Sequence, residues 1–477
     1  MGQRVVIEPV TRVEGHGKVT IQLDDAGQVD QARMHIVEFR GFERFVQGRP
    51  YWEVPVMVQR LCGICPVSHH LCAAKAMDYV TGRERLTPTA EKMRRLMHYG
   101  QTFQSHALHF FHLCSPDLLF GFDAPVEKRH VIAVAREHKE LAVQGVMMRK
   151  YGQEIIKATA GKKIHGTGAI PGGINKNLSI AERDGFLADI DQQLDWARSA
   201  LELAKNYTVE HLDLAKTFAA FDSNHAGLVR EDGTLDLYHG NLRFKDAEGN
   251  VIVDQMDPQD YHKVLAEEVR SWSYMKFPFI RELGPEKGWY RVGPLARINV
   301  CDRIDTPEAE QARQEFMAVT DGKPNNLSLA YHWTRMIELL HSAEQIKQLL
   351  NDPDLQGEDL IADSTGFRGE GAAILEAPRG TLFHHYKVDE NDQVTMGNLI
   401  VSTTSNNEPM NRAVESVAKQ YLSGKQITDG LLNHVEVAIR AYDPCLSCAT
   451  HAVGRMPLEL ELTDATGRII DRKSKDC

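Results

Sequence analysis

Apolar and polar residues alternate near the start of the chain. This period of two runs over residues 4–38, on both sides of the turn sequence DDAGQ. Alternation is typical of strands with one buried face, and a glycine-containing turn joins such strands. We therefore expect a β-hairpin over 4–38. Residues 226–256 are also hairpin-like, with turns at EDGT and DAEGN, and strands return across 372–403.

Most of the remaining chain has apolar residues at helical spacing. Residues 88–113 predict a long buried helix, and 127–158 have a similar pattern. Ser179 and Glu182 have the spacing of a capping box, which predicts a helix from there to about Lys205. Further helices are expected at 306–319, 326–350, 409–423 and 428–442. The pattern predicts an α+β fold, mainly α, in which a bundle of long helices forms the core and β-hairpins and sheets decorate it.

The helical pattern of residues 54–80 is interrupted at the sequence CGICP. Gly63 breaks the period, and Pro66 suits the first position of a new helix. Cys65 would then lie near the N-cap of that helix. Since the helix dipole favours an anion at this position, the Cys65 thiol should ionise more easily than a free cysteine.

Length and composition indicate a globular protein with more than one packed region. The chain has 477 residues, of which 42% are hydrophobic and 25% charged. A net charge of −11 argues against a nucleic-acid surface, which needs a basic face. No run approaches the ~20 apolar residues of a membrane span, and the N-terminus lacks the apolar region of a secretory signal. We therefore expect a cytoplasmic protein without a membrane span.

Four of the eight cysteines form two C-x-x-C pairs, Cys62 with Cys65 and Cys445 with Cys448. Pro444 can start a turn that places the second pair on one face. The pairs are about 380 positions apart, and closing a flexible loop of that length would cost roughly 5 kcal/mol. We therefore expect the folded core to bring them together. Spacing alone leaves three interpretations open: structural zinc, a catalytic or redox soft-metal centre, or unconnected core cysteines.

The sequences around both pairs contain groups that structural zinc does not need. Four stretches together resemble the large, catalytic subunit of [NiFe]-hydrogenases: TRVEGHGKV (11–19), RGFE (40–43), RLCGICPVSH (60–69) and DPCLSCATH (443–451). GKKIHGTGAIPGG (161–173) and EAPRGTLFHH (376–385) fit the same family. The matches follow the family order over nearly the whole chain. They are most similar to the soluble, bidirectional, NAD-linked branch.

The resemblance implies a metal centre of nickel and iron, in which the iron carries carbonyl and cyanide ligands. Cys62 and Cys445 would be terminal thiolates on nickel, and Cys65 and Cys448 would bridge nickel to iron. Soft thiolates suit both metals. A magnesium-type ion would be held by Glu43 and His451.

Further residues take roles only through the resemblance. Glu14 would relay the proton that leaves Cys445 after heterolytic H2 cleavage. Arg379, which follows Pro378, would lie over the open face of nickel. Without the resemblance, Glu14 would be a carboxylate packed at a strand end and Arg379 part of a structural ion pair.

The resemblance also implies residues around these groups. Asp117 and Asp443 would hold the Arg379 guanidinium. His69 would donate a hydrogen bond to a bridging cysteine, with Arg60 nearby. Ser402 is a candidate donor to an iron-bound cyanide.

Other cysteines and histidines predict packing rather than chemistry. We expect Cys72, Cys114 and Cys301 to be small core residues. His106, His109 and His112 share a helix face, but their neighbours Phe and Leu indicate packed or hydrogen-bonded side chains. No P-loop and no G-x-G-x-x-G after a strand are present, so we expect no nucleotide site in this chain. The chain has no further cysteine cluster, so we expect no iron–sulfur cluster in it either.

The resemblance therefore implies partners. Electrons from H2 would pass first to an iron–sulfur small subunit, then to an NAD-reducing diaphorase module. Nickel chaperones and a dedicated endopeptidase would mature the chain. The endopeptidase would cut after His451 and remove residues 452–477.

Two other classes of function compete with a hydrogenase. A scaffold related to the family, as in respiratory complex I, lacks the cysteine ligands and binds quinone. All four cysteines are present here, which argues against that class. A zinc or dithiol protein is the second alternative, and metal analysis would distinguish it.

We expect one interwoven catalytic subunit. Its parts would be an N-terminal β region with the first metal-site elements (1–53), a helical core with the first C-x-x-C (54–220), a β-hairpin insertion (221–260), helices and strands with the second C-x-x-C (261–451), and a removable extension (452–477).

Overall fold

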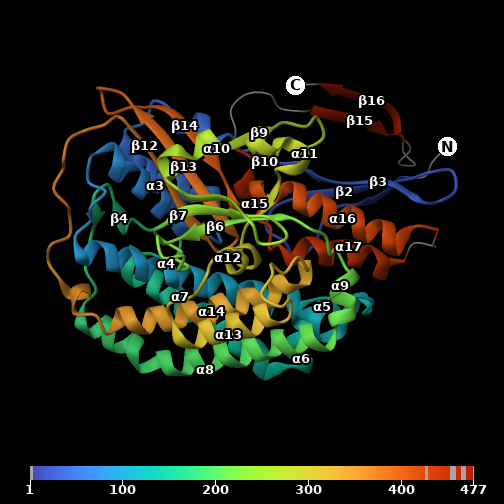
Figure 1. The fold of residues 1–477 in the computed structure, drawn as a ribbon, viewed down its shortest axis with the longest axis horizontal. Coiled ribbons are helices and arrows are strands. Elements are labelled where there is room, and N and C mark those ends of the chain that lie inside the picture. Colours follow the sequence, from blue (N-terminus) through green and yellow to red (C-terminus); the bar gives the residue numbers. More distant parts are fainter. Residues whose placement is uncertain (1–3, 425–427, 452–457, 464–468, 476–477) are drawn as a thin grey trace.

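The computed structural model describes residues 4–424, 428–451, 458–463 and 469–475. Long helices fill the lower part of the molecule in Figure 1, and the sheets lie above them. The predicted mainly helical α+β fold is confirmed. No helix among the described residues is long and apolar enough to cross a membrane.

Four long helices make the bundle: α4 (Pro88–Leu108), α7 (Lys139–Ala160), α8 (Ile180–Glu210) and α14 (Tyr331–Leu350). Helix α4 packs against α7 and α14, and α14 also packs against α8. Nearly every residue of α4 and α14 is buried, whereas α8 buries one stripe. A stripe of that kind is typical of a surface helix. α4 and α14 are therefore the centre of the helical core.

Local signals predicted several helix ends. The Ser179 hydroxyl accepts the backbone N–H of Glu182 at 3.2 Å, and the Glu182 carboxylate accepts the N–H of Ser179 at 3.0 Å, so the capping box is confirmed. The helix runs to Glu210, beyond the expected end. The helical stretch expected over 127–158 is two helices, α6 (Val131–Glu137) and α7, because His138 leaves the helical region with φ −132° and ψ 57°. No glycine or proline marks that turn.

The N-terminal strands form an antiparallel sheet in the order β1 (Arg4–Ile7), β2 (Gly17–Leu23), β3 (Val29–Ile36). The predicted hairpin is β2–β3, and its turn contains Gly27 at φ +76°. Helix α16 (Asn407–Leu422) packs on β3, with α17 (Asp429–Ala441) beside it (Figure 1).

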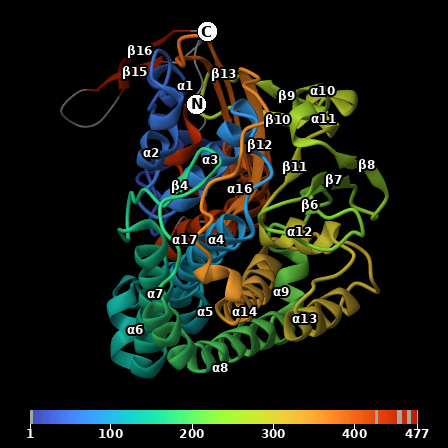
Figure 2. The ribbon, with the colours of Figure 1, turned by 90° about the vertical axis from the view of Figure 1, so that its left-hand side faces the viewer.

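A second antiparallel sheet carries part of the candidate site. Its strands are β12 (Glu370–Ala377), β13 (Gly380–Val388) and β14 (Val394–Ile400), in that order. Helix α3 (Pro66–Val80) packs against β12 and β13 (Figure 2). α3 starts at Pro66 with Cys65 as its N-cap residue, as the sequence predicts.

The expected hairpin at 226–256 is part of a larger sheet. Strands β6 (Asn224–Val229), β7 (Asn241–Lys245) and β8 (Val251–Met256) are antiparallel neighbours, and β11 (Tyr290–Arg291) adds to β6 in parallel. The fourth strand comes from a later segment, so the local alternation could not indicate it. Two further two-stranded sheets pair β9 (Leu265–Glu268) with β10 (Phe277–Ile280), and β4 (Ala169–Ile170) with β5 (Gly173–Ile174).

The remaining elements are short or peripheral. They are α1 (Phe42–Phe45), α2 (Val54–Met57), α5 (Ser115–Phe120), α9 (Leu212–Thr217), α10 (Tyr261–Val264), α11 (Gly284–Lys287), α12 (Pro294–Val300), α13 (Pro307–Ala318), α15 (Ser402–Ser405), β15 (Leu458–Thr463) and β16 (Ile469–Lys475). β15 and β16 pair as an antiparallel hairpin.

One hydrophobic core joins the two ends of the chain. It contains residues from Ile7 in β1 to Ala449 after α17, together with α4 and α14. The two C-x-x-C segments lie where this core meets α3 and the β12–β14 sheet.

Candidate metal centre

The four paired cysteines lie together in the interior. All four Sγ atoms are within 4.8 Å of one another, and all four side chains are buried. The Sγ atoms of Cys62 and Cys445 are 3.3 Å apart, and those of Cys65 and Cys448 are 3.8 Å apart. The folded core therefore brings the two pairs together, as expected.

The first pair is positioned by the start of α3. Cys62 is extended, with φ −145° and ψ 140°, and Cys65 caps the helix. The Cys62 sulfur accepts the backbone N–H groups of Ile64 at 3.2 Å and of Cys65 at 3.1 Å. Hydrogen bonds from backbone amides favour the thiolate, because they stabilise its negative charge.

The second pair is positioned by contacts with two distant segments. The backbone N–H of Cys445 donates to the Thr403 hydroxyl at 2.9 Å, and the N–H of Leu446 donates to the Glu14 carbonyl at 3.0 Å. A Cβ atom on Gly15, whose φ is +84°, would lie 2.7 Å from the Ser447 nitrogen. Glycine is therefore required for this close approach.

The protonation of the cysteine cluster depends on what it binds. Burial raises the pKa of Cys445 and Cys448 well above that of a free thiol. A bound soft metal reverses this, because coordination deprotonates a thiol. Zinc, or nickel with iron, would meet this requirement, so the four sulfurs alone do not choose between these metals.

Arg379 supplies the observation that distinguishes the site from structural zinc. Its guanidinium donates to Asp443 Oδ1 at 3.1 Å, while Nε and Nη1 are buried without a partner among the described residues. Burial opposes its charge, but Asp443 and the cysteines Cys445, Cys65 and Cys62 keep its pKa well above the ordinary value. Two unused N–H donors beside the sulfurs fit a metal centre that carries anionic ligands. A structural zinc ion bound by four cysteines has no such ligands.

A small cavity adjoins the cysteines. It is lined by Cys65, His69, Ala377, Pro378, Arg379, Leu382, Val401, Ser402, Thr403, Cys445 and Cys448. Pro378 and Ser402 are thus next to the cluster, where the resemblance puts them. The Ser402 hydroxyl donates to the Gly380 carbonyl at 2.6 Å, so its proton is already used.

Glu14 contacts Cys445 directly. The Cys445 sulfur donates to Glu14 Oε2 at 3.1 Å, and the Ser447 N–H donates to the same oxygen at 3.1 Å. The Ser447 hydroxyl donates to Glu38 at 3.3 Å, and Glu38 pairs with His16, whose side chain is 69% exposed. Polar contacts thus extend from the cluster to the surface. Sequence reasoning missed Ser447 and Glu38, because only the fold places them beside Glu14.

The expectation for Arg60 is wrong. Its side chain is exposed and its Nη1 donates to the Val56 carbonyl of its own segment at 3.0 Å. Arg40, from the RGFE motif, instead donates to the carbonyls of Arg60 at 3.0 Å and Leu61 at 2.9 Å. Arg40 therefore braces the segment before Cys62, a role that the sequence did not indicate.

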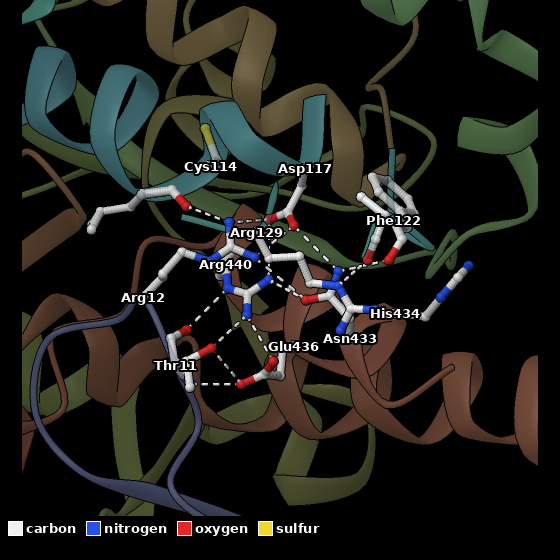
Figure 3. Close-up of polar contacts among 12 residues, drawn as sticks. Thr11, Arg12, Cys114, Asp117, Phe122, Arg129, Asn433, His434, Glu436 and Arg440 are labelled. Atoms are coloured by element: carbon white, nitrogen blue, oxygen red, sulfur yellow. Dashed lines mark hydrogen bonds and ion pairs between the residues drawn. The ribbon is translucent and has the colours of Figure 1, made fainter. Parts of the chain in front are cut away.

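The expected contact of Asp117 with Arg379 is also absent from the described residues. Asp117 lies between Arg12 at 2.7 Å and Arg440 at 3.0 Å, and Asn433 donates to it at 3.3 Å (Figure 3). Burial opposes its charge, but Arg440 and Arg12 outweigh this and lower its pKa. Asp117 therefore ties the N-terminal segment to α17, and among the described carboxylates Asp443 is the one that holds Arg379.

Glu43 and His451 are adjacent. The Glu43 N–H donates to the His451 carbonyl at 3.2 Å, and Glu43 Oε1 accepts the N–H of Leu399 at 2.8 Å. Both ring nitrogens of His451 are buried without a hydrogen-bond partner among the described residues. A carboxylate and an imidazole with two unused nitrogens are groups that bind divalent cations.

A second cluster of ligand-type side chains lies in the helical core. His109, Cys114 and His332 offer ligand atoms within 4.8 Å of one another. His109 Nε2 donates to the Arg440 carbonyl at 2.7 Å. Burial first, and then the nearby Arg335 charge, lower the pKa of both histidines. His109 Nδ1 lies 3.9 Å from the Cys114 sulfur, so these residues contact one another in the packed core, as we expected for His109 and Cys114.

Known proteins share this arrangement of segments. A family model described as nickel-dependent hydrogenase matches residues 40–120 and 186–451, and one described as HoxL-like matches residues 4–39. The beta subunit of the NAD-reducing hydrogenase HoxS of Cupriavidus necator is 50% identical over 489 positions that cover all of both chains. A relative from the F420-non-reducing hydrogenase of Methanothermobacter thermautotrophicus is 42% identical over 98% of this chain and 99% of that protein.

Solved structures agree. An NAD+-reducing [NiFe]-hydrogenase in the H2-reduced state matches with a TM-score of 0.92 and 56% identity, over 94% of this chain and 99% of that one. The Ni-Fe-Se hydrogenase of D. vulgaris Hildenborough matches with a TM-score of 0.75 at 22% identity, over 94% and 100%, and shares the fold. The family match over more than half of the chain and the relative that is half identical over its whole length lead to one conclusion: the chain belongs to the nickel-dependent hydrogenases, as a large [NiFe]-hydrogenase subunit.

Proposed function

We propose that the chain catalyses H2 ⇌ 2H⁺ + 2e⁻ and that the electrons reach NAD+ through partner subunits. The observation that carries the proposal is the contact of Glu14 with Cys445 inside a cluster of four buried cysteines. A carboxylate on a metal-binding sulfur is placed to take up a proton. NAD+ as the acceptor is supported by the name of the Cupriavidus relative, and a cytoplasmic location follows from that acceptor.

The four cysteines would hold nickel and iron, the iron with carbonyl and cyanide ligands. Cys62 and Cys445 would be terminal on nickel, and Cys65 and Cys448 would bridge the metals. When bound, the metals supply the site at which H2 is split heterolytically. The anionic ligands would meet the two unused donors of Arg379.

The chain's own residues would bind and move charge around that site. Glu14 Oε2 would accept the proton from the Cys445 sulfur. Arg379 would remain charged, held by Asp443, with Pro378 fixing the turn before it. Ser402 could serve a cyanide as donor only after its hydroxyl leaves Gly380.

Electron transfer would need partners. Among the described residues the other buried cysteines, Cys72, Cys114 and Cys301, do not gather into a cluster of cysteines. An iron–sulfur small subunit would therefore receive the electrons, and a diaphorase module would reduce NAD+.

Glu43 and His451 would hold a magnesium-type ion, and His451 would become the mature C-terminus. Nickel chaperones would load the metal, and an endopeptidase would then remove 452–477. The nickel-dependent hydrogenase match ends at residue 451, which supports this division of the chain into an interwoven unit of residues 1–451 and an extension. Removal predicts an intact mass that ends at His451. Active enzyme that retains the extension would contradict it.

Infrared spectroscopy of the purified, nickel-loaded enzyme tests the proposed centre. Carbonyl and cyanide stretches, with nickel and iron near one per chain, are expected. Zinc alone, without these bands, would favour the zinc alternative. H2-dependent reduction of NAD+ by the assembled enzyme tests the acceptor.

A further inference from the structure

Three buried residues form a hydrogen-bonded row that ends at the cavity beside the cysteines. His69 Nδ1 lies 3.2 Å from His384 Nε2, and His384 Nδ1 lies 2.7 Å from the Tyr386 hydroxyl. His69 comes from α3, and the other two from β13, which packs on it. None of the three side chains is more than 1% exposed. His69 lines the cavity with Cys65 and Cys448.

Burial disfavours a positive charge on either imidazole. Burial lowers the pKa of His69 to about 4 and that of His384 well below the ordinary value. A neutral imidazole has one N–H and one acceptor nitrogen, so a hydrogen bond between two rings fixes which nitrogen of each carries the proton. The two hydrogen bonds can therefore have only two polarities: donation runs either from Tyr386 through His384 to His69, or in the opposite direction.

The hydroxyl of Tyr386 decides between them. In one polarity Tyr386 donates to His384 Nδ1, and His384 Nε2–H donates to His69 Nδ1. In the other, His384 donates to Tyr386, and the tyrosine proton then has no acceptor among the described residues. A buried donor without a partner costs about 1–3 kcal/mol, so the first polarity is favoured.

We propose that Tyr386, acting through His384, fixes the His69 tautomer so that Nε2–H is offered to the sulfurs of the cavity. Tyr386 and His384 are positioning residues, because neither lines the cavity. In the opposite polarity His69 would present a lone pair to thiolates, which repel it. The inference rests on the proposed function, since the benefit depends on thiolate ligands.

An N–H directed at a metal-bound sulfur withdraws electron density from the metals and raises their potential. Without Tyr386, only the sulfurs favour this tautomer, so the opposite tautomer becomes more populated. The iron should then donate more electron density to its carbonyl. The carbonyl stretch should move to lower wavenumber, and the midpoint potential should become more negative.

The test is Tyr386→Phe in the assembled holoenzyme, with infrared spectra and potentials as readouts. We expect both shifts with unchanged nickel and iron content. The matched control is Tyr151→Phe, which removes the hydroxyl of another buried tyrosine. That hydroxyl donates to the Phe186 carbonyl at 3.0 Å, away from the cavity. The control should leave the spectrum unmoved.

A second variant separates tautomer control from packing. His69→Asn offers an amide N–H that needs no tautomer, so adding Tyr386→Phe to it should move the bands no further. Bands that do not move in Tyr386→Phe, or that move equally in the His69→Asn background, would overturn the inference. If the wild-type enzyme has no carbonyl or cyanide bands, the proposed function fails instead.

Discussion

The Cys445 sulfur lies 3.1 Å from Glu14 Oε2, although 431 positions separate the two residues. A parallel β-bridge between the same residues fixes the contact, and the Leu446 N–H donates to the Glu14 carbonyl at 3.0 Å. The carboxylate is therefore held by backbone structure, and a conservative change at Glu14 should alter proton transfer without moving the cysteines.

Glu14→Gln should reduce H2 oxidation by at least about a hundredfold, the range of a lost general base. The amide keeps the shape of the side chain but does not accept the proton. Turnover measured with an artificial acceptor, beside infrared spectra, checks this. The carbonyl and cyanide bands should persist.

Glu127→Gln is the matched control, because Glu127 is exposed on the surface segment before α6. It should keep wild-type turnover. Near-normal activity of Glu14→Gln would remove Glu14 from the proton route.

Arg379→Lys should lower turnover by about a hundredfold, the usual effect of losing one preorganised donor. Lysine keeps the charge but not the planar fork, so the contact of 3.1 Å to Asp443 and the unused donors cannot both be reproduced. Metal content should be unchanged. Arg368→Lys, at a surface ion pair with Glu84, is the control and should keep wild-type turnover. Equal effects of the two variants would contradict a role for Arg379 at the metals.

Local sequence signals predicted the helix starts and strand patterns that depend only on neighbouring residues. Pro66 at the start of α3, the Ser179 capping box and the alternation of β2 each depend on residues within one or two turns. The cysteine cluster was also predictable, but only through the resemblance of the flanking sequences to a known family, because the C-x-x-C spacing alone left structural zinc, a catalytic or redox metal centre and unconnected core cysteines open. The fold class and the four ligands could therefore be inferred from the sequence.

Partners that come from distant segments were not predictable. Asp117 was expected to pair with Arg379, but it forms ion pairs with Arg12 and Arg440 instead. Arg60 lies in a short helical turn, Val58–Leu61, and its side chain is exposed. The row from His69 to Tyr386 depends on how α3 packs against β13, and no periodicity indicates which side chains of two elements meet.

Asp117→Asn should lower the free energy of unfolding by about 3 kcal/mol, since breaking a buried ion pair leaves uncompensated charge. The folded-state pKa of Asp117 lies below its ordinary value of 3.8, because the opposing arginines outweigh burial. Its contribution is therefore present above about pH 4 and is lost as pH falls through the lower folded-state pKa. Urea unfolding of both proteins between pH 3 and pH 7 checks this, and the difference between them should shrink toward pH 3.

Asp184→Asn is the control for Asp117, since Asp184 forms an exposed pair with Arg183. It should change stability by less than about 0.5 kcal/mol. A variant of Asp117 that unfolds like wild type but has lost turnover would show that Asp117 acts at the metal site.

Glu43→Gln should abolish binding of the proposed divalent ion. Magnesium is held by carboxylate oxygens, and an amide is a weaker ligand without charge. Both His451 nitrogens lack a protein partner among the described residues, and each unsatisfied buried group costs about 1–3 kcal/mol. Loss of the ion should therefore also lower the melting temperature.

Elemental analysis and thermal unfolding check this, with the exposed Glu53→Gln as control. Chelator treatment should lower the melting temperature of wild type to that of Glu43→Gln and leave the variant unchanged. A variant that retains stoichiometric magnesium would show that Glu43 is not a ligand.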